Sequence, residues 1–496
     1  MFFTSTRASL NVTAAEAVAR GISAEGGLFV PSEFPVFTPE FLKRLLPMNY
    51  RERAAAILSM YLTGFTGEEV AHCVGGAYKG TFEDDAPAPL HTISPEVHML
   101  ELWHGPTCAF KDLALQILPF LLTAAVGKSA PGTVPVILVA TSGDTGKAAL
   151  AGFAGVPGTR IIVFFPKNGV SPIQRLQMVT QTGENAAVCA IEGNFDDAQT
   201  GVKKIFGDGE MKRFLSARGM AFSSANSINF GRLAPQIVYY VSAYCDLVRQ
   251  GGVVLGEKVN VTVPTGNFGN ILAAVYAKRM GLPLGRLVCA SNRNNILTDF
   301  LRTGVYDRNR PFFTTSSPSM DILISSNLER LLYHLYGNDP QATAALMRQL
   351  AAKGRYEVSA GVFRALREEF YGGFCDEAAT RKTIGDLFRE KHYLCDPHTA
   401  VAVKVHGDYV RETGDRTPCI IASTASAFKF ARPVLESIDT AAVPEDGFAA
   451  LERLSALSGL PVPAPLAELR TKEIRHRTCV AEEGMAGFIR AFLDRR

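Results

Sequence analysis

Disulfide and metal patterns are missing from this 496-residue sequence. Its nine cysteines are scattered, and none belongs to a Cys-x-x-Cys pair. An odd number without a framework is typical of reduced thiols in a cytosolic protein. His392-x-x-Cys395-x-x-His398 has the residue types of metal ligands, but Asp396-Pro397 begins a helix inside it and no fourth ligand is near. We therefore predict no metal site.

Strong charge and long hydrophobic runs are also lacking. The 51 Lys and Arg residues nearly balance 48 Asp and Glu residues, and the formal charge of +3 includes no basic block. This argues against nucleic acid as a partner. The longest apolar stretch, near 117–126, is too short and interrupted to span a bilayer. The first residues lack a charged leader before an apolar core, so we expect a cytoplasmic protein with no membrane partner.

The overall amino-acid composition is typical of a globular enzyme. Hydrophobic residues make up 47% and charged residues 20%, with 44 Gly and 27 Pro. The length favours roughly three domains. We predict a mainly helical N-terminal domain (1–95), an α/β core (96–436) with a smaller subdomain of about 112–230 inserted in it, and a helical C-terminal extension (437–496).

The core alternates between strand and helix patterns, which is typical of a parallel α/β sheet. Buried strands are expected at 97–102, 134–140, 160–165, 187–192, 258–264 and 419–422. Helices are expected at 147–153, 171–182, 196–206, 233–249, 271–280, 340–353, 359–369, 376–390 and 399–405. The region 284–340 shows no clear period and is expected to be rich in loops. One doubly wound core with added ends is the predicted architecture.

Lys111 stands where a turn meets a helix. His104-Gly-Pro-Thr107 interrupts both helix and strand, and after Phe110 the apolar spacing predicts one buried helix through residue 122. Burial and the positive end of the helix dipole would lower the pKa of this lysine. A neutral amine is the nucleophile that a Schiff base with an aldehyde needs. The alternative for a lone lysine is an ordinary surface side chain at a helix start.

Three polar segments follow expected strand ends. Gly266-Asn-Phe-Gly-Asn270 can cradle a phosphate with its amides, or can be a simple tight turn. Thr141-Ser-Gly-Asp-Thr-Gly-Lys147 lacks the spacing of a nucleotide P-loop, and its hydroxyls suit a carboxylate. Thr424 lies at the edge where open α/β sheets bind ligands; its hydroxyl can reach a ring nitrogen or close a Ser/Thr turn.

Taken in order, these segments resemble the threonine synthase family of fold type II pyridoxal-phosphate enzymes. The resemblance covers nearly the whole chain and is carried by residues 4–7, 26–31, 104–112, 140–146, 226–232, 266–270, 396–401 and 423–425. It implies two open parallel-sheet α/β domains with pyridoxal 5'-phosphate in the cleft between them. It also implies conversion of O-phospho-L-homoserine and water to L-threonine and phosphate, in a monomer or homodimer.

The resemblance further implies roles for individual residues. Lys111 would hold the cofactor covalently and move protons. Cofactor contacts would come from Gly266, Asn267, Phe268, Gly269 and Asn270 at the phosphate, Thr424 at the ring nitrogen and Asp144 near the 3-hydroxyl. The substrate carboxylate would be received by Thr141, Ser142, Gly143 and Thr145. Lys147 and Arg232 are the candidates for contacting the leaving phosphate.

One position departs from the family pattern. The family usually follows Ser-Thr-Ala with His-Pro and a Lys-Phe pair, whereas here Ser426 and Ala427 precede Phe428-Lys429-Phe430. The loss of that histidine affects substrate handling and leaves the cofactor site intact. One alternative follows: a threonine-synthase-like phospholyase that releases 2-oxobutyrate and phosphate. A separate alternative is an inactive scaffold of the family without cofactor, which a missing lysine or a broken phosphate loop would favour, and neither defect is present.

Overall fold

Two open β-sheets organise the computed structural model, which describes residues 1–141, 143–168, 170–439 and 441–495. The larger sheet has the strand order β14 (Phe370–Phe374), β11 (Leu284–Ser291), β10 (Val259–Pro264), β15 (Cys419–Ser423), β5 (Val97–Glu101) and β4 (Leu90–Ser94). The smaller sheet has the order β16 (Cys479–Val480), β8 (Ala186–Ile191), β7 (Arg160–Pro166), β6 (Val134–Ala140) and β9 (Met220–Ser223). All neighbours are parallel except β4 and β5. The predicted α/β class is confirmed.

Helices surround both sheets, and two short antiparallel sheets complete the fold. The short sheets are β2 (Val12–Thr13), β1 (Phe2–Ser5) and β3 (Phe29–Pro31), and β12 (Val305–Asp307) with β13 (Arg355–Glu357). The helices up to β9 are α1 (Ala14–Arg20), α2 (Pro39–Leu45), α3 (Tyr50–Tyr61), α4 (Gly67–Tyr78), α5 (Lys111–Leu115), α6 (Leu118–Ser129), α7 (Asp144–Phe153), α8 (Pro172–Val179), α9 (Phe195–Gly207) and α10 (Gly209–Ser216). The later helices are α11 (Phe230–Arg249), α12 (Gly269–Arg279), α13 (Ile296–Thr303), α14 (Leu328–Leu335), α15 (Pro340–Lys353), α16 (Ala360–Glu369), α17 (Glu377–Lys391), α18 (Pro397–Thr413), α19 (Ala431–Ile438), α20 (Gly447–Ser458), α21 (Ala464–Ala467) and α22 (Met485–Leu493). Among the described residues, no helix has both the length and the apolar character needed to cross a bilayer.

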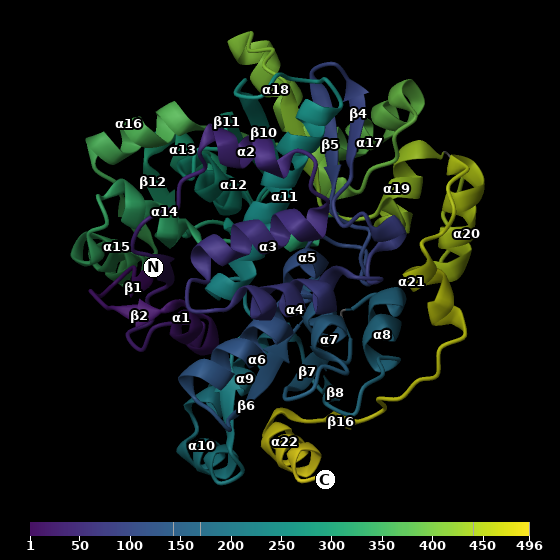
Figure 1. Ribbon diagram of the computed structural model, residues 1–496. Helices are drawn as coiled ribbons and strands as arrows, with labels where there is room; N and C mark the ends of the chain where they lie inside the picture. The colour runs from purple at the N-terminus through teal and green to yellow at the C-terminus, as the bar shows by residue number, and fades with distance from the viewer. Residues whose placement is uncertain (142, 169, 440, 496) are drawn as a thin grey trace.

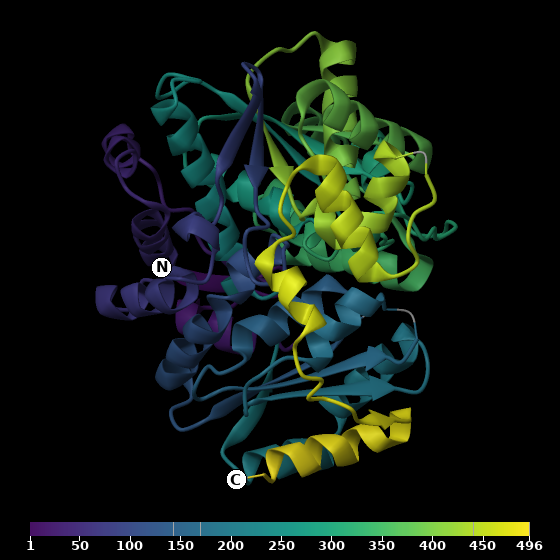
Figure 2. The same ribbon diagram turned by 90° about the vertical axis from the view of Figure 1, so that its right-hand side faces the viewer.

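Each sheet buries both faces, so its strands are apolar throughout rather than alternating. On the smaller sheet, α6, α7 and α8 cover one face and α9, α10 and α22 cover the other. On the larger sheet, α11 and α12 pack on one face, and α18 and α19 pack on the opposite face. Figure 2 shows the two sheets one above the other, with the larger sheet at the top.

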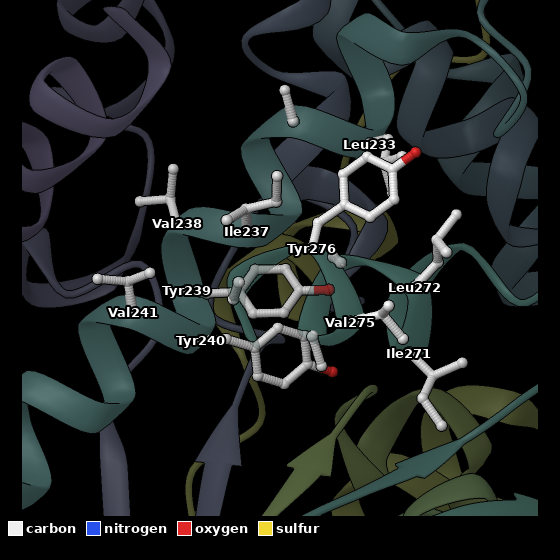
Figure 3. Packing of buried hydrophobic residues seen from close by; sticks show 14 of the residues in the cluster. Leu233, Ile237, Val238, Tyr239, Tyr240, Val241, Ile271, Leu272, Val275 and Tyr276 are labelled. Carbon is white, nitrogen blue, oxygen red and sulfur yellow. The ribbon is translucent and has the colours of Figure 1, made fainter. Parts of the chain in front are cut away.

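Helices α11 and α12 pack against each other in the core, and this packing fixes the start of α12. Figure 3 shows Tyr239 and Tyr240 of α11 lying next to each other near Val275 of α12. Both tyrosine hydroxyls donate to Oδ1 of Asn270, at 2.7 Å from Tyr239. Asn270 is the last residue of the segment Gly266–Asn270, called the glycine loop below, so the buried tyrosine pair holds that loop in position.

The helix that begins at Lys111 differs from the single long helix expected. The helical hydrogen-bond pattern is interrupted at Gln116 and Ile117, although both residues keep right-handed helical dihedral angles, and the chain continues as α6. Pro119 has no N–H and cannot donate to the carbonyl of Leu115. Helix α7 also approaches closely, since a Cβ on Gly152 would lie 2.1 Å from the carbonyl oxygen of Leu115. Proline chemistry and this close contact together shorten α5 to five residues.

The region 284–340 contains more structure than the expected loops. Strand β11 lies inside the larger sheet between β10 and β14, and α13 and α14 follow it.

Strand β14 lies outside that region and was not expected from the sequence, because its two glycines disfavour a strand. Both glycines are required by packing: a Cβ on Gly372 would lie 3.1 Å from Cβ of Leu301, and one on Gly373 would lie 2.6 Å from Cγ1 of Val405.

The last segment of the chain connects the two sheets. Helices α19, α20 and α21 lie beside the larger sheet, and the chain then runs to the smaller sheet, as the yellow ribbon shows (Figures 1 and 2). There β16 pairs with β8 through Cys479 and Ala190, and α22 packs on one sheet face. Strand β16 lies within the region expected to be helical, and two residues are too few for a periodic signal.

Candidate active site

Lys111 is the first residue of α5, and its side chain is only 12% exposed. Its Nζ donates to Oγ of Ser319 at 3.2 Å and lies 3.9 Å from Oδ2 of Asp144. Burial, partly offset by the Asp144 carboxylate, lowers the pKa of Lys111 to about 8. Near neutral pH a useful fraction of this amine is therefore unprotonated, as a nucleophile requires.

Asp144, at the start of α7, is the centre of a buried ion cluster. Its Oδ1 lies 3.0 Å from Nζ of Lys147 and 3.0 Å from Nζ of Lys429, while its Oδ2 accepts from Oγ of Ser319 at 3.2 Å. Burial alone would raise the pKa of Asp144, but the ammonium groups of Lys429, Lys147 and Lys111 hold it well below its usual range. Burial and the nearby Lys429 lower the pKa of Lys147 to about 7. The cluster therefore contains a permanent carboxylate and a lysine that titrates near neutral pH.

Ser319 lies between these two groups, in the short turn η2 (Pro318–Met320). Its N–H donates to Nε2 of His398 at 3.2 Å, and Nδ1 of His398 lies 2.5 Å from Oδ2 of Asp396. Because Nε2 accepts, the neutral imidazole carries its proton on Nδ1 and donates it to Asp396. His398 and Asp396 are buried and hold the backbone of Ser319 in position beside Lys111.

The two histidines of His392-x-x-Cys395-x-x-His398 have structural roles. His398 contacts Asp396 and Ser319, while His392 is the C-cap of α17 with a left-handed φ of 54°. Within residues 1–141, 143–168, 170–439 and 441–495, no three or more His, Cys, Asp or Glu side chains are grouped so as to hold a metal ion.

The glycine loop connects the end of β10 to α12. Phe268 takes a left-handed φ of 60° as the N-cap residue of α12, which turns the chain sharply. Oγ of Ser325 donates to the carbonyl of Gly266 at 2.7 Å, and the backbone and side-chain N–H groups of Asn327 donate to the carbonyl of Asn267 at 3.1 Å each. Since N–H and C=O point in opposite directions in a trans peptide, the amides of Asn267 and Phe268 face away from these partners. This orientation leaves the two amides available to an anion.

The glycine loop lies against the lysine site. A Cβ on Gly266 would be 2.8 Å from the carbonyl oxygen of Ser319, whose side chain contacts Lys111. Gly269 is the first residue of α12, and its amide therefore belongs to the free helix N-terminus. The side chain of Asn270, by contrast, is occupied by the tyrosine pair of α11.

Thr424 is buried immediately after β15. Its carbonyl accepts from the N–H of Phe110 at 2.9 Å, and its own N–H donates to Oγ1 of Thr399 at 3.3 Å. The first bond places Thr424 beside the residue that precedes Lys111. Strands β10, β15 and β5 are neighbours in the larger sheet, so the segments that follow them lie along one edge.

Ser426, where the family pattern has histidine, has a structural role. It is the N-cap of the turn η3 (Ala427–Phe430), and its Oγ accepts from the N–H of Phe428 at 3.3 Å. The turn presents Lys429, whose Nζ donates to the carbonyl of Thr107 at 2.6 Å and contacts Asp144. Ser426 therefore helps to position a lysine of the ion cluster.

The loop expected to receive the substrate carboxylate is shaped by Thr141. Its Oγ1 donates to the carbonyl of Gly143 at 3.0 Å and accepts from the N–H groups of Gly143 and Gly146 at 3.1 and 3.2 Å. Thr145, in the first turn of α7, is partly exposed. Ser142 lies outside the described residues.

Arg232, the other residue expected at the substrate phosphate, is buried in the first turn of α11. Its guanidinium donates to the carbonyl of Ala225 at 3.0 Å, and its Nε has no hydrogen-bond partner among the described residues. Burial lowers the pKa of Arg232 to about 10, so it stays charged near neutral pH. Its charge contributes to the lowered pKa of Lys111, which places the two groups in one electrostatic environment.

Sequence reasoning missed two residues of this site. Lys429 belongs to the Lys-Phe pair of the family pattern, and that pair was the available signal. Ser319 lies in the region without a periodic pattern, and only the fold places it against Lys111.

Comparisons with known proteins identify the family. A model described as "Threonine synthase N terminus" matches residues 2–78, and one described as "Pyridoxal-phosphate dependent enzyme" matches residues 86–423. The chain is 40% identical over 484 residues to "Threonine synthase-like 1" of Homo sapiens, which covers 94% of this chain. The chain spans only 64% of the length of that relative.

Two threonine synthases match over more of their length. That of Pseudomonas aeruginosa is 38% identical over 414 residues, or 84% of this chain and 85% of the relative. The crystal structure of PLP-bound threonine synthase from Brucella melitensis has 36% identity and a TM-score of 0.89, and the match covers 99% of each chain. The chain therefore belongs to the threonine synthase family of pyridoxal-phosphate-dependent enzymes.

Proposed function

We propose that the protein is a threonine synthase that converts O-phospho-L-homoserine and water to L-threonine and phosphate, with pyridoxal 5'-phosphate as cofactor. One observation carries the proposal: the buried Lys111 amine, with a pKa of about 8, lies beside Asp144 and beside Ser319, whose backbone packs against the glycine loop. The residues fit the cofactor. The amine suits its aldehyde, and the loop amides suit its phosphate. The edge that carries Thr424 suits its ring.

In this reaction, each residue of the site has a separate role. When bound, pyridoxal phosphate delocalises the negative charge that forms on the substrate carbons while phosphate leaves from Cγ. Lys111 removes and returns protons at Cα and Cβ as general base and acid. Oγ of Ser319 orients Nζ of Lys111 through its hydrogen bond. Lys147 and Arg232 supply positive charge for the leaving phosphate, and water then adds at Cβ.

The pKa of Lys111 predicts how the apoenzyme takes up its cofactor. Only the neutral amine attacks an aldehyde, so the second-order rate of pyridoxal-phosphate attachment is expected to rise with pH and level off above about 8. Stopped-flow absorbance between pH about 6 and about 10 measures this rate, with N-acetyl-lysine, whose amine has a pKa near 10.4, as the reference. A midpoint equal to that of the reference would contradict the lowered pKa.

Product analysis tests the reaction itself. Holoenzyme incubated with O-phospho-L-homoserine is expected to release phosphate and threonine in equal amounts. Phosphate accompanied by 2-oxobutyrate would refute the synthase and establish the phospholyase. If neither threonine nor 2-oxobutyrate is released, the result supports the alternative that the protein is an inactive scaffold of the family.

One observation favours the phospholyase as the second candidate. Ser426 replaces the histidine of the family pattern, and its hydroxyl is used by the turn η3. The relative named "Threonine synthase-like 1" also carries a name distinct from that of the synthases. Ser426→His is the matched variant, and a phospholyase reading predicts that it raises the share of threonine among the products.

The class of substrate, the oligomeric state and the location of the protein are inferred from the same proposal. We infer a small-molecule substrate, a monomer or homodimer and a cytoplasmic location. All nine cysteines are free and only Cys479 is exposed, which supports a reducing compartment.

A further inference from the structure

A cavity lies between the smaller sheet and the C-terminal segment. Its volume is about 860 Å³, within the range of small-molecule sites. One wall is the loop Gly155–Pro157 after α7 together with residues 183–188 at the start of β8. The other wall is formed by residues 475–478 and the last turns of α22. None of the residues assigned above to the active site lines this cavity.

Backbone hydrogen bonds hold both walls in place. The N–H groups of Arg475 and His476 donate to the carbonyl of Val179 at 2.8 and 3.0 Å, and β16 continues this attachment along β8. On the opposite wall, Oδ1 of the buried Asn185 accepts from the N–H of Gly155 at 2.7 Å. The cavity is therefore formed before a ligand binds, which lowers the entropic cost of binding.

The lining of this cavity is strongly cationic. Four arginines contribute to it, and Glu184 is the only acidic residue among the lining residues; the arginines are Arg160, Arg475, Arg477 and Arg495. Arg475 lies 3.9 Å from Glu473, whereas the other three form no ion pair with a described residue. Guanidinium groups bind phosphate oxygens through two parallel N–H donors, so a phosphorylated ligand would relieve their mutual repulsion.

Apolar side chains complete the cavity. Phe488 and Phe492 of α22 line it, opposite Val156 and Pro157. Phe492 is buried, and Phe488 packs edge-on against Phe164 with ring centroids 5.8 Å apart, so these rings are held in fixed positions. Fixed aromatic rings beside guanidinium groups suit a ligand that has a flat ring and phosphates.

We propose that this cavity is a nucleotide-binding site, with the phosphates at the arginines and the base against the phenylalanines of α22. This inference is independent of the reaction proposed for Lys111. Titration calorimetry of the holoenzyme, whose own phosphate loop is already occupied by the cofactor, tests it with ATP and with inorganic pyrophosphate. One site per chain is expected, with ATP binding more tightly than pyrophosphate because only ATP contacts the apolar wall.

Matched variants locate the binding. Arg477→Ala with Arg495→Ala is expected to weaken ATP binding by at least about tenfold, since two exposed guanidinium donors are lost. Arg348→Ala, at an exposed arginine of α15, is the control and should leave the affinity unchanged. Glu184→Gln removes the acidic residue and should tighten binding. Absent ATP binding, equal affinity in the double variant, or tighter binding of pyrophosphate than of ATP would each overturn the proposal; thermal unfolding checks that the variants fold.

Discussion

Lys111→Ala is expected to abolish the visible absorption band of the cofactor and to lower threonine formation by roughly 10³-fold or more. Nζ of Lys111 is both the proposed attachment point and the proposed general base, and a positioned base alone contributes about 10²–10⁴-fold. Substrate amine can still react with free cofactor, so the loss measures proton transfer together with orientation. The spectrum of the purified variant and its turnover number are the two measurements.

A loss of folding would mimic this result, so the comparison needs controls. Lys128→Ala removes a partly exposed lysine of α6 and should keep both the band and the activity. In Lys111→Ala the cluster keeps the close contacts of Asp144 with Lys147 and Lys429, so the unfolding temperature should change little. Survival of the absorption band in Lys111→Ala would show that another amine holds the cofactor.

The parts of the site that follow strand ends could be predicted from the sequence. Lys111, the glycine loop and Thr424 each come after an apolar run, and parallel strands end at one edge of a sheet. The order β10-β15-β5 then places these segments side by side, although their sequence separations are large. Strand order is a property of the folded sheet, and local sequence patterns do not predict it.

Other parts could not be predicted because tertiary packing decides them. Ser319 has no periodic neighbours, and it reaches Lys111 only because His398 and Asp396 hold its turn. Strand β14 contains Gly372 and Gly373, which oppose a strand locally and are required by the helices on both faces. In each case a contact between distant segments overrides the local preference.

Asp144→Ala is expected to be strongly destabilising. The substitution leaves the fully buried Nζ atoms of Lys147 and Lys429 without the carboxylate that lies 3.0 Å from each. Removing one partner of a buried ion pair typically costs about 3–5 kcal/mol, because the remaining charge is uncompensated. Denaturant unfolding of the two proteins gives the difference in free energy. Asp299→Ala, at a largely exposed aspartate that pairs with Arg310, is the comparison for an ordinary ion pair and should cost less.

The pH dependence of this loss distinguishes uncompensated charge from lost packing. In the native protein Lys147 has a pKa of about 7, below its unfolded value of 10.5, so the unfolded state binds more protons between these values and stability rises with pH. Without the Asp144 carboxylate the folded pKa of Lys147 falls further, and the penalty for keeping it neutral below pH 7 is added. The destabilisation by Asp144→Ala should therefore be larger at pH about 6 than at pH about 9. A loss of the same size at both pH values would mean that Asp144 stabilises the fold through packing alone.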